Sequence, residues 1–136
     1  MGVSGIGLEV LDVAAFLAQL DTDGSRFTME AFTAAEREQA GESDPTRAQR
    51  LAARFAAKLA FLQAVSATCM LDAAALASAD LSEVEVVNDT YGRPSLRVCR
   101  QLAVLVQGRL GSNWTAHVSL THDGPSAAAV VVLESA

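Results

Sequence analysis

One stretch constrains the fold of this chain more than any other: residues 48–64, which read AQRLAARFAAKLAFLQA. At about 100° per residue, Leu51, Phe55 and Leu62 fall on one arc, which predicts a long amphipathic helix. The only lysine of the chain, Lys58, falls inside that arc. A buried ammonium group must be paired or deprotonated, unless its side chain extends past the core to water. The pattern leaves both possibilities open for Lys58.

Composition narrows the class of protein. The chain has 136 residues and is 51% hydrophobic but only 5% aromatic, so alanine, valine and leucine must build the core. This length predicts a single domain over residues 1–136. No apolar run is long enough to span a membrane, and the net charge of −6 argues against nucleic acid as a partner. Cys69 and Cys99 lack metal-ligand spacing, so we expect thiols and a cytoplasmic location.

Periodicity, capping residues and turn residues predict an α+β fold, in which a small, mainly antiparallel sheet packs on the long helix. The predicted helices cover about 13–20, 33–41, 45–65 and 100–110, and the predicted strands cover 3–10, 82–88, 94–98, 114–121 and 127–133. Thr33 and Glu36 form a capping box, and Gly5 and Gly7 allow another backbone to approach closely. Residues 21–25 are predicted to be a loop, residues 88–92 a hairpin turn and 122–125 a second turn, whereas 66–79 are ambiguous.

Positive charge gathers on the long helix. Four of the ten basic residues lie between Arg47 and Lys58, and Arg54 and Lys58 are one turn apart. Such a density predicts an anion site on one helix face, because guanidinium and ammonium groups bind phosphates and carboxylates well. The alternative is that Arg54 pairs with an acidic residue of another element.

Five segments stand in order along the chain: GIGLEV at 5–10, FTAAERE at 32–38, LAARFAAK at 51–58, EVVNDTYGRPSL at 85–96 and HVSLTHDGPSAAAVVVLE at 117–134. Together they resemble the holo-[acyl-carrier-protein] synthases, the short bacterial members of the 4′-phosphopantetheinyl transferase superfamily. The resemblance covers essentially the whole chain. It implies the 4′-phosphopantetheinyl transferase fold and a homotrimer with active sites between neighbouring subunits. The implied reaction moves the phosphopantetheine arm of coenzyme A to a serine of an acyl carrier protein.

The resemblance also implies a magnesium ion on the pyrophosphate of coenzyme A. In the family it is held by an aspartate that ends the first strand and by a glutamate directly after the helix lysine. Glu9 corresponds to the aspartate, but Leu59 stands where the glutamate should be and cannot bind a hard cation. Gln63 replaces a second lysine that binds phosphate, so it brings no charge. A magnesium site would therefore depend on Glu9 and on the substrate phosphates.

Other implied site residues are retained. Arg54 matches a phosphate-binding arginine of the family, and His122 matches a histidine near the nucleotide end of coenzyme A. Ser119 offers a hydroxyl group on the same predicted strand. Lys58 is implied to hold a phosphate or to assist deprotonation of the carrier serine. The first predicted helix, 13–20, has no basic residue for an acidic carrier protein.

Three functions of different classes follow from these residues. The first is the phosphopantetheinyl transferase, with Lys58, Glu9 and His122 as catalytic groups. The second is a metal-free enzyme of the same fold, in which the same three residues are polar groups of an apolar pocket. Such an enzyme would cyclise or isomerise a small molecule of polyketide or other natural-product biosynthesis. The third is a non-catalytic binding subunit, and fold resemblance does not choose among them.

Overall fold

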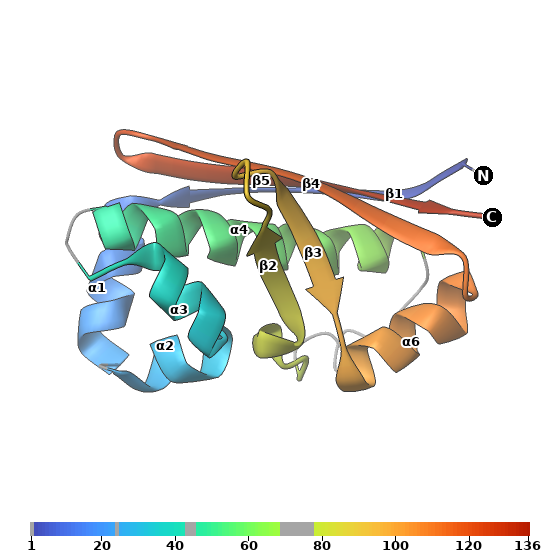
Figure 1. Ribbon diagram of the computed structural model, residues 1–136, viewed down its shortest axis with the longest axis horizontal. Coiled ribbons are helices and arrows are strands. Elements are labelled where there is room, and N and C mark those ends of the chain that lie inside the picture. The colour runs from blue at the N-terminus through green and yellow to red at the C-terminus, as the bar shows by residue number, and fades with distance from the viewer. Residues whose placement is uncertain (1, 24, 43–45, 69–77) are drawn as a thin grey trace.

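The long helix α4 (Thr46–Thr68) lies along one face of a three-stranded antiparallel sheet (Figure 1). The strand order is β1–β5–β4, with β1 at Gly2–Asp12, β4 at Trp114–Asp123 and β5 at Ser126–Ser135. The structure is a computed structural model and describes residues 2–23, 25–42, 46–68 and 78–136. The predicted α+β fold, with an antiparallel sheet on a long helix, is confirmed.

The remaining elements surround α4 on the side away from this sheet (Figure 1). They are α1 (Val13–Asp23), α2 (Ser25–Ala31), α3 (Ala34–Ala40), the 3-10 helix η1 (Leu81–Glu83), β2 (Val84–Asn88), β3 (Pro94–Val98) and α6 (Arg100–Leu110). Strands β2 and β3 form a separate antiparallel hairpin, as predicted. In Figure 1, α1, α2 and α3 lie at one end of α4, α6 lies at the other end, and the hairpin lies between them.

Two glycines let β1 lie directly against α4. A Cβ atom on Gly5 would lie 2.2 Å from the carbonyl oxygen of Ala64, and one on Gly7 would lie 1.8 Å from that of Ala60. No side chain fits at such distances, so the predicted close approach at these glycines is confirmed. Glu9, two residues further along β1, is thereby held beside α4.

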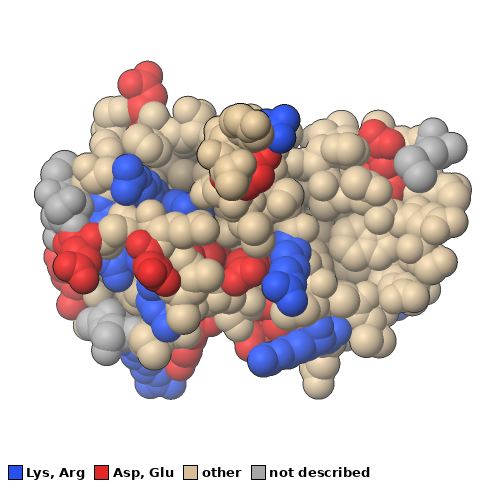
Figure 2. Space-filling view, viewed as in Figure 1, with Lys and Arg blue, Asp and Glu red and all other residues tan. Residues whose placement is uncertain are grey.

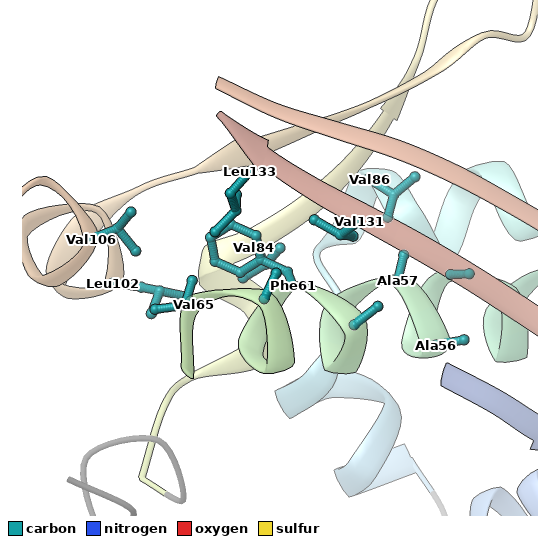
Figure 3. Close-up of a cluster of buried hydrophobic side chains, with 13 residues drawn as sticks. Ala56, Ala57, Phe61, Val65, Val84, Val86, Leu102, Val106, Val131 and Leu133 are labelled. Atoms are coloured by element: carbon teal, nitrogen blue, oxygen red, sulfur yellow. The ribbon is translucent and has the colours of Figure 1, made fainter. Parts of the chain in front are cut away.

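Two apolar clusters share α4. The first joins α4 to the hairpin, α6 and β5, and Figure 3 shows Phe61 and Val65 beside Val84 and Leu133. The second joins α4 to α1, α2 and α3. In it the rings of Phe16, Phe27, Phe32 and Phe55 have centroid separations of 5.3–6.4 Å. Most of the buried residues of α4 are alanines, so its buried face is wider than the predicted arc.

Capping residues and a terminal glycine mark several helix ends. The amide of Glu36 donates to Thr33 Oγ1 at 3.2 Å and the amide of Thr33 donates to Glu36 Oε1 at 2.9 Å, so the predicted capping box is confirmed. Gly41 ends α3 with a φ of 81°, a conformation that favours glycine. The side chain of Asp12 accepts hydrogen bonds from the amides of Ala14 and Ala15 and caps α1.

Other boundaries were wrong. The predicted loop at 21–25 is helical through Asp23 and again from Ser25, and the Thr22 hydroxyl bonds the Ala18 carbonyl within α1. Strand β2 begins at Val84 because η1 occupies the residues before it. His122 lies inside β4, which continues to Asp123. The predicted start of the long helix at residue 45, residues 69–77 of the ambiguous segment and Cys69 lie outside the described residues, whereas Cys99 is a free thiol.

The face of the sheet opposite α4 carries apolar side chains on β1. Val3, Ile6, Leu8 and Val10 are each between 58% and 62% exposed in the single chain. Among the described helices, none combines the length and apolar character that a membrane crossing requires.

Candidate functional site

A cavity of about 600 Å³ lies where α3, α4, the β2–β3 turn and the end of β4 meet. We call it the basic pocket, and its lining residues are Gln39, Arg50, Ala53, Arg54, Asn88, Asp89, Leu120, Thr121 and His122. Arg50 and His122 are exposed, so both side chains are accessible to a ligand in the pocket. In Figure 2, charged side chains of both signs gather over the half of this face that α1, α2, α3 and the hairpin form.

Arg54 is the buried charge of the basic pocket. Its side chain is only 5% exposed, and it donates from Nη1 to the Arg50 carbonyl at 3.2 Å and from Nη2 to Gln39 Oε1 at 3.4 Å. Its Nε is buried and has no hydrogen-bond partner among the described residues. Burial lowers the pKa of Arg54, and the charge of Glu36 opposes that shift, but a guanidinium stays protonated at neutral pH. A buried cation with a spare donor is suited to bind an anion.

Asp89 also lines this pocket, but its carboxylate accepts hydrogen bonds from residues of the hairpin turn. Its oxygens accept hydrogen bonds from the amides of Tyr91 and Arg93, at 2.8 and 2.9 Å, and from Arg93 Nε at 2.6 Å. The bonds from Arg93 hold the pKa of Asp89 below its usual value. Arg93 therefore compensates this negative charge within the turn, which leaves Arg54 without a carboxylate partner among the described ion pairs.

A second cavity, of about 490 Å³, lies between β1 and α4 and is lined by Glu9, Leu59, Leu62, Gln63, Ser66 and Ala67. We call it the Glu9 pocket. Gln63 donates from Nε2 to Glu9 Oε2 at 2.5 Å and accepts from the amide of Leu8 at 3.2 Å. One carboxylate oxygen is thus already bound to a neutral amide.

The donors of the Glu9 pocket do not fit a magnesium ion. Mg²⁺ prefers six oxygen ligands in an octahedron, and among the residues that the structure describes Glu9 is the one carboxylate that lines this pocket. Leu59, which the resemblance places at the position of the family glutamate, also lines this pocket. Throughout the described ranges, no group of three or more His, Cys, Asp or Glu side chains could hold a metal ion.

Lys58 lies in neither of these pockets, because its side chain is completely buried. Its Nζ donates to Glu36 Oε1 at 2.8 Å and to the carbonyl oxygens of Leu81 at 2.9 Å and Val84 at 2.5 Å. Nζ also lies 5.4 Å from the centre of the Phe32 ring. Burial lowers the pKa of Lys58, and the Glu36 carboxylate opposes the shift.

The sequence left two possibilities open for this lysine, and the structure shows the buried, paired one. Lys58 does not extend to water, and Glu36 of α3 supplies the carboxylate that compensates its charge. A substrate atom could reach Nζ only by displacing Glu36 or a backbone carbonyl group. The predicted part of Lys58 in the reaction remains a prediction.

Comparison with known proteins gives the family. The family model described as the 4′-phosphopantetheinyl transferase superfamily matches residues 5–131. The chain belongs to this superfamily. The holo-[acyl-carrier-protein] synthases of Mycobacterium tuberculosis H37Rv and Mycobacterium ulcerans Agy99 are 37% and 36% identical to it over 135 residues, with 99% of each chain covered.

Solved structures agree with this assignment. The ACPS–CoA complex of Chronobacterium ammoniagenes matches with a TM-score of 0.86 and 28% identity, covering 100% of this chain and 99% of that one. The acyl carrier protein synthase of Mycobacterium tuberculosis matches with a TM-score of 0.71 and 33% identity, covering 99% and 100%. The resemblance inferred from five sequence segments is confirmed.

The predicted site residues of this superfamily member divide into separate groups. Arg54 and His122 line the basic pocket, whereas Glu9 and Gln63 line the Glu9 pocket. Ser119 is exposed on β4 but is not among the lining residues of either pocket. Arg54 and Gln63 are nine residues apart on α4, which is about 180° around a helix. The two pockets therefore lie on opposite sides of α4 within one chain.

Several residues of the basic pocket were missed, among them Arg50, Gln39 and Asn88. Arg50 could have been found, because it lies one turn before Arg54 on the same helix. Gln39 and Asn88 gave no signal in the sequence, since they reach the pocket only through the packing of α3 and of the hairpin on α4.

Proposed function

We propose that this protein, in the cytoplasm, binds the nucleotide end of coenzyme A in the basic pocket and transfers the phosphopantetheine arm to a serine of an acyl carrier protein. The observation that carries the proposal is the buried Arg54 guanidinium, with its free Nε, beside Arg50 and His122. A guanidinium in this setting suits phosphate oxygens, which it binds through charge-assisted hydrogen bonds. Relatives at 36–37% identity carry the name holo-[acyl-carrier-protein] synthase, and the Chronobacterium structure is named as a complex with CoA.

The transfer reaction requires groups that stabilise the leaving bisphosphate and a base that accepts the proton of the serine hydroxyl. The serine oxygen of the carrier attacks the phosphorus that bears the pantetheine arm, and the bond from this phosphorus to the bridging oxygen breaks. Adenosine 3′,5′-bisphosphate leaves with the bonding electron pair, and Arg54 and Arg50 stabilise its charge. The second oxygen of Glu9 can accept the serine proton, because Gln63 engages only Oε2. No step assigned to this chain passes through a metal ion.

These groups can act together only across two copies of the chain. The basic pocket and the Glu9 pocket are on opposite sides of α4, and the exposed apolar side chains of β1 give the sheet a surface that a second copy can cover. Both observations support a homotrimer with sites between subunits. Light scattering at micromolar concentration should give the trimer mass, and a clean monomer would count against this assembly.

A second candidate function is favoured by Leu59 and Gln63, which stand where the family has two charged groups of its reaction centre. Gln63 instead donates a hydrogen bond to Glu9. In this case the fold no longer transfers phosphopantetheine. Glu9 then acts as a base on a small molecule, in a cyclisation or isomerisation within natural-product biosynthesis, or the protein only binds its ligand.

A loading assay separates the two candidates. The protein is incubated with coenzyme A, Mg²⁺ and an apo-acyl carrier protein, and intact mass spectrometry reports the gain of one phosphopantetheine group. Transfer that disappears in Arg54→Met supports the first candidate. Absence of transfer, together with binding of adenosine 3′,5′-bisphosphate, favours the second, and absence of both contradicts the assignment of the basic pocket.

A further inference from the structure

The buried pair of Glu36 and Lys58 joins three elements of the fold. Lys58 extends from α4 to Glu36 on α3 and to the carbonyl oxygen of Val84, the first residue of β2. The second oxygen of Glu36 accepts a hydrogen bond from the amide of Val86 on the same strand, at 2.9 Å. Both side chains are 0% exposed. We refer to Glu36, Lys58 and the β2 groups that they bind as the clasp.

The same three elements form walls of the basic pocket, close to the clasp. On α3, Gln39 is three residues after Glu36, and on α4, Arg54 is four residues before Lys58. Residues three or four apart lie on the same side of a helix, so each pocket residue stands next to a clasp residue. On β2, Asn88 is two residues after Val86, and residues two apart share one face of a strand. Gln39, Arg54 and Asn88 all line the basic pocket.

The clasp has a complete set of hydrogen bonds. The three donors of the ammonium group meet Glu36, Leu81 and Val84, and the Glu36 oxygens also accept from the amides of Thr33 and Val86. A buried polar network in which each member is satisfied favours a single arrangement of the backbone around it. A buried ion pair is, in contrast, weak evidence for stability, because well-packed apolar residues often replace it without loss. We therefore expect apolar replacement of Glu36 and Lys58 to loosen the arrangement of the backbone around them more than it lowers stability.

We propose that Glu36 and Lys58 are positioning residues, which hold α3, α4 and β2 at the separation that the basic pocket needs to bind a nucleotide bisphosphate. The inference rests on the proposed function, because that function supplies the ligand. Neither residue touches the ligand. Their effect passes through Gln39, Arg54 and Asn88, and it is an effect on affinity rather than on whether the chain folds.

The test uses adenosine 3′,5′-bisphosphate, titrated by calorimetry into four forms of the full chain: the wild type, Arg54→Met, Phe61→Leu and the double variant Glu36→Gln/Lys58→Met. The double variant avoids leaving a buried, unpaired carboxylate, which could prevent folding of Lys58→Met alone. Phe61→Leu is the matched control, since Phe61 is fully buried on α4 but packs near Trp114, in the other apolar cluster. Circular dichroism gives the melting temperature of each form.

We expect the wild type to bind and Arg54→Met to lose binding. The double variant should bind about tenfold more weakly while folded, because misplacing binding groups by about 1 Å can cost up to a hundredfold. Phe61→Leu should melt earlier and bind like the wild type. Unchanged affinity in the double variant overturns the inference and leaves the proposed function standing, as does an equal loss in Phe61→Leu. A wild type that binds no bisphosphate overturns both.

Discussion

Gln63 and Glu9 are joined by a hydrogen bond of 2.5 Å from the amide nitrogen of one to the carboxylate of the other. Gln63 also accepts a hydrogen bond from the amide of Leu8, so it binds both the side chain and the backbone of β1. Because β1 is an edge strand of its sheet, this amide side chain satisfies a backbone donor that no neighbouring strand pairs. A lysine at 63 could not accept that bond. The substitution therefore changes both the charge of the Glu9 pocket and the way its wall is held.

The first prediction concerns magnesium. Titration calorimetry of the free protein with Mg²⁺ should show no binding in the millimolar range, because one partly engaged carboxylate does not organise an octahedral site. Tight binding would contradict this reading of the Glu9 pocket. It would also require another carboxylate to move in, such as Asp12, which now caps α1.

The second prediction restores the missing charges. Leu59→Glu combined with Gln63→Lys should raise magnesium-dependent loading of an apo-carrier protein by about a hundredfold, since single groups that stabilise developing charge contribute this much. Gln63→Lys alone is the control and should change loading little, because it restores no metal ligand. If the wild type already loads the carrier as fast as the double variant, Glu9 and the substrate phosphates are sufficient.

The third prediction is a double-mutant cycle on the clasp. Lys58→Met should lower the free energy of unfolding by about 3–5 kcal/mol, because it leaves the Glu36 carboxylate buried without its partner. Lys58→Met and Lys58→Ala should also lower the activity, because each removes a positioning residue of the basic pocket. Adding Glu36→Gln should recover most of the stability, and urea denaturation of the wild type, both single variants and the double variant measures the coupling. Simple addition of the two single effects would show that the residues do not interact.

The fourth prediction is a pH dependence of the β2–β3 hairpin. Hydrogen bonds from Arg93 lower the pKa of Asp89 in the folded chain, so the folded state holds this proton less tightly than the unfolded state does. The stabilisation from Asp89 is present above its ordinary pKa of 3.8 and is lost as the pH falls through the lower, folded value. The carboxyl carbon, followed by NMR, should therefore titrate below 3.8. Arg93→Gln should move the titration upwards, and a wild-type midpoint at or above 3.8 contradicts the assignment.

The fifth prediction tests the contact between β1 and α4. Gly7→Ala should lower the free energy of unfolding by about 3 kcal/mol or more, because the added Cβ overlaps the Ala60 carbonyl and overpacking of a close contact is costly. Gly108→Ala is the matched control. Its Cβ meets nothing within 4 Å and lies in helix α6, so it should raise stability by up to about 1 kcal/mol. Equal effects of the two changes would argue against the close approach.

Signals that act over a few residues predicted much of this fold. The capping box at Thr33 and Glu36, the hairpin turn after Asn88 and the glycine that ends α3 each depend on groups close together in sequence. The loop predicted at 21–25 failed because polar residues such as Thr22 can also bond back to their own helix. Local composition cannot separate these two outcomes.

The candidate site was predicted less completely. Arg54 and His122 were found because segment matches marked them, and the structure brings them together. The partner of Lys58 was not found, because Glu36 is 22 residues away and belongs to a capping box that explained it fully. Residues that meet only through tertiary packing leave no spacing pattern in the sequence. A charged residue at a predicted core position therefore indicates that it needs a partner, but not which residue the partner is.

The strand order β1–β5–β4 has a consequence for how the protein is made. The central strand, β5, is translated after every other element that the structure describes, yet both of its neighbours pair only with it. During synthesis, β1 and β4 therefore remain unpaired in this sheet until residues 126–135 have been made. The pairing of Gly2 with Ser135 then joins two segments that lie far apart in the sequence, and long-range strand pairing of this kind slows folding and prolongs the exposure of unpaired strands.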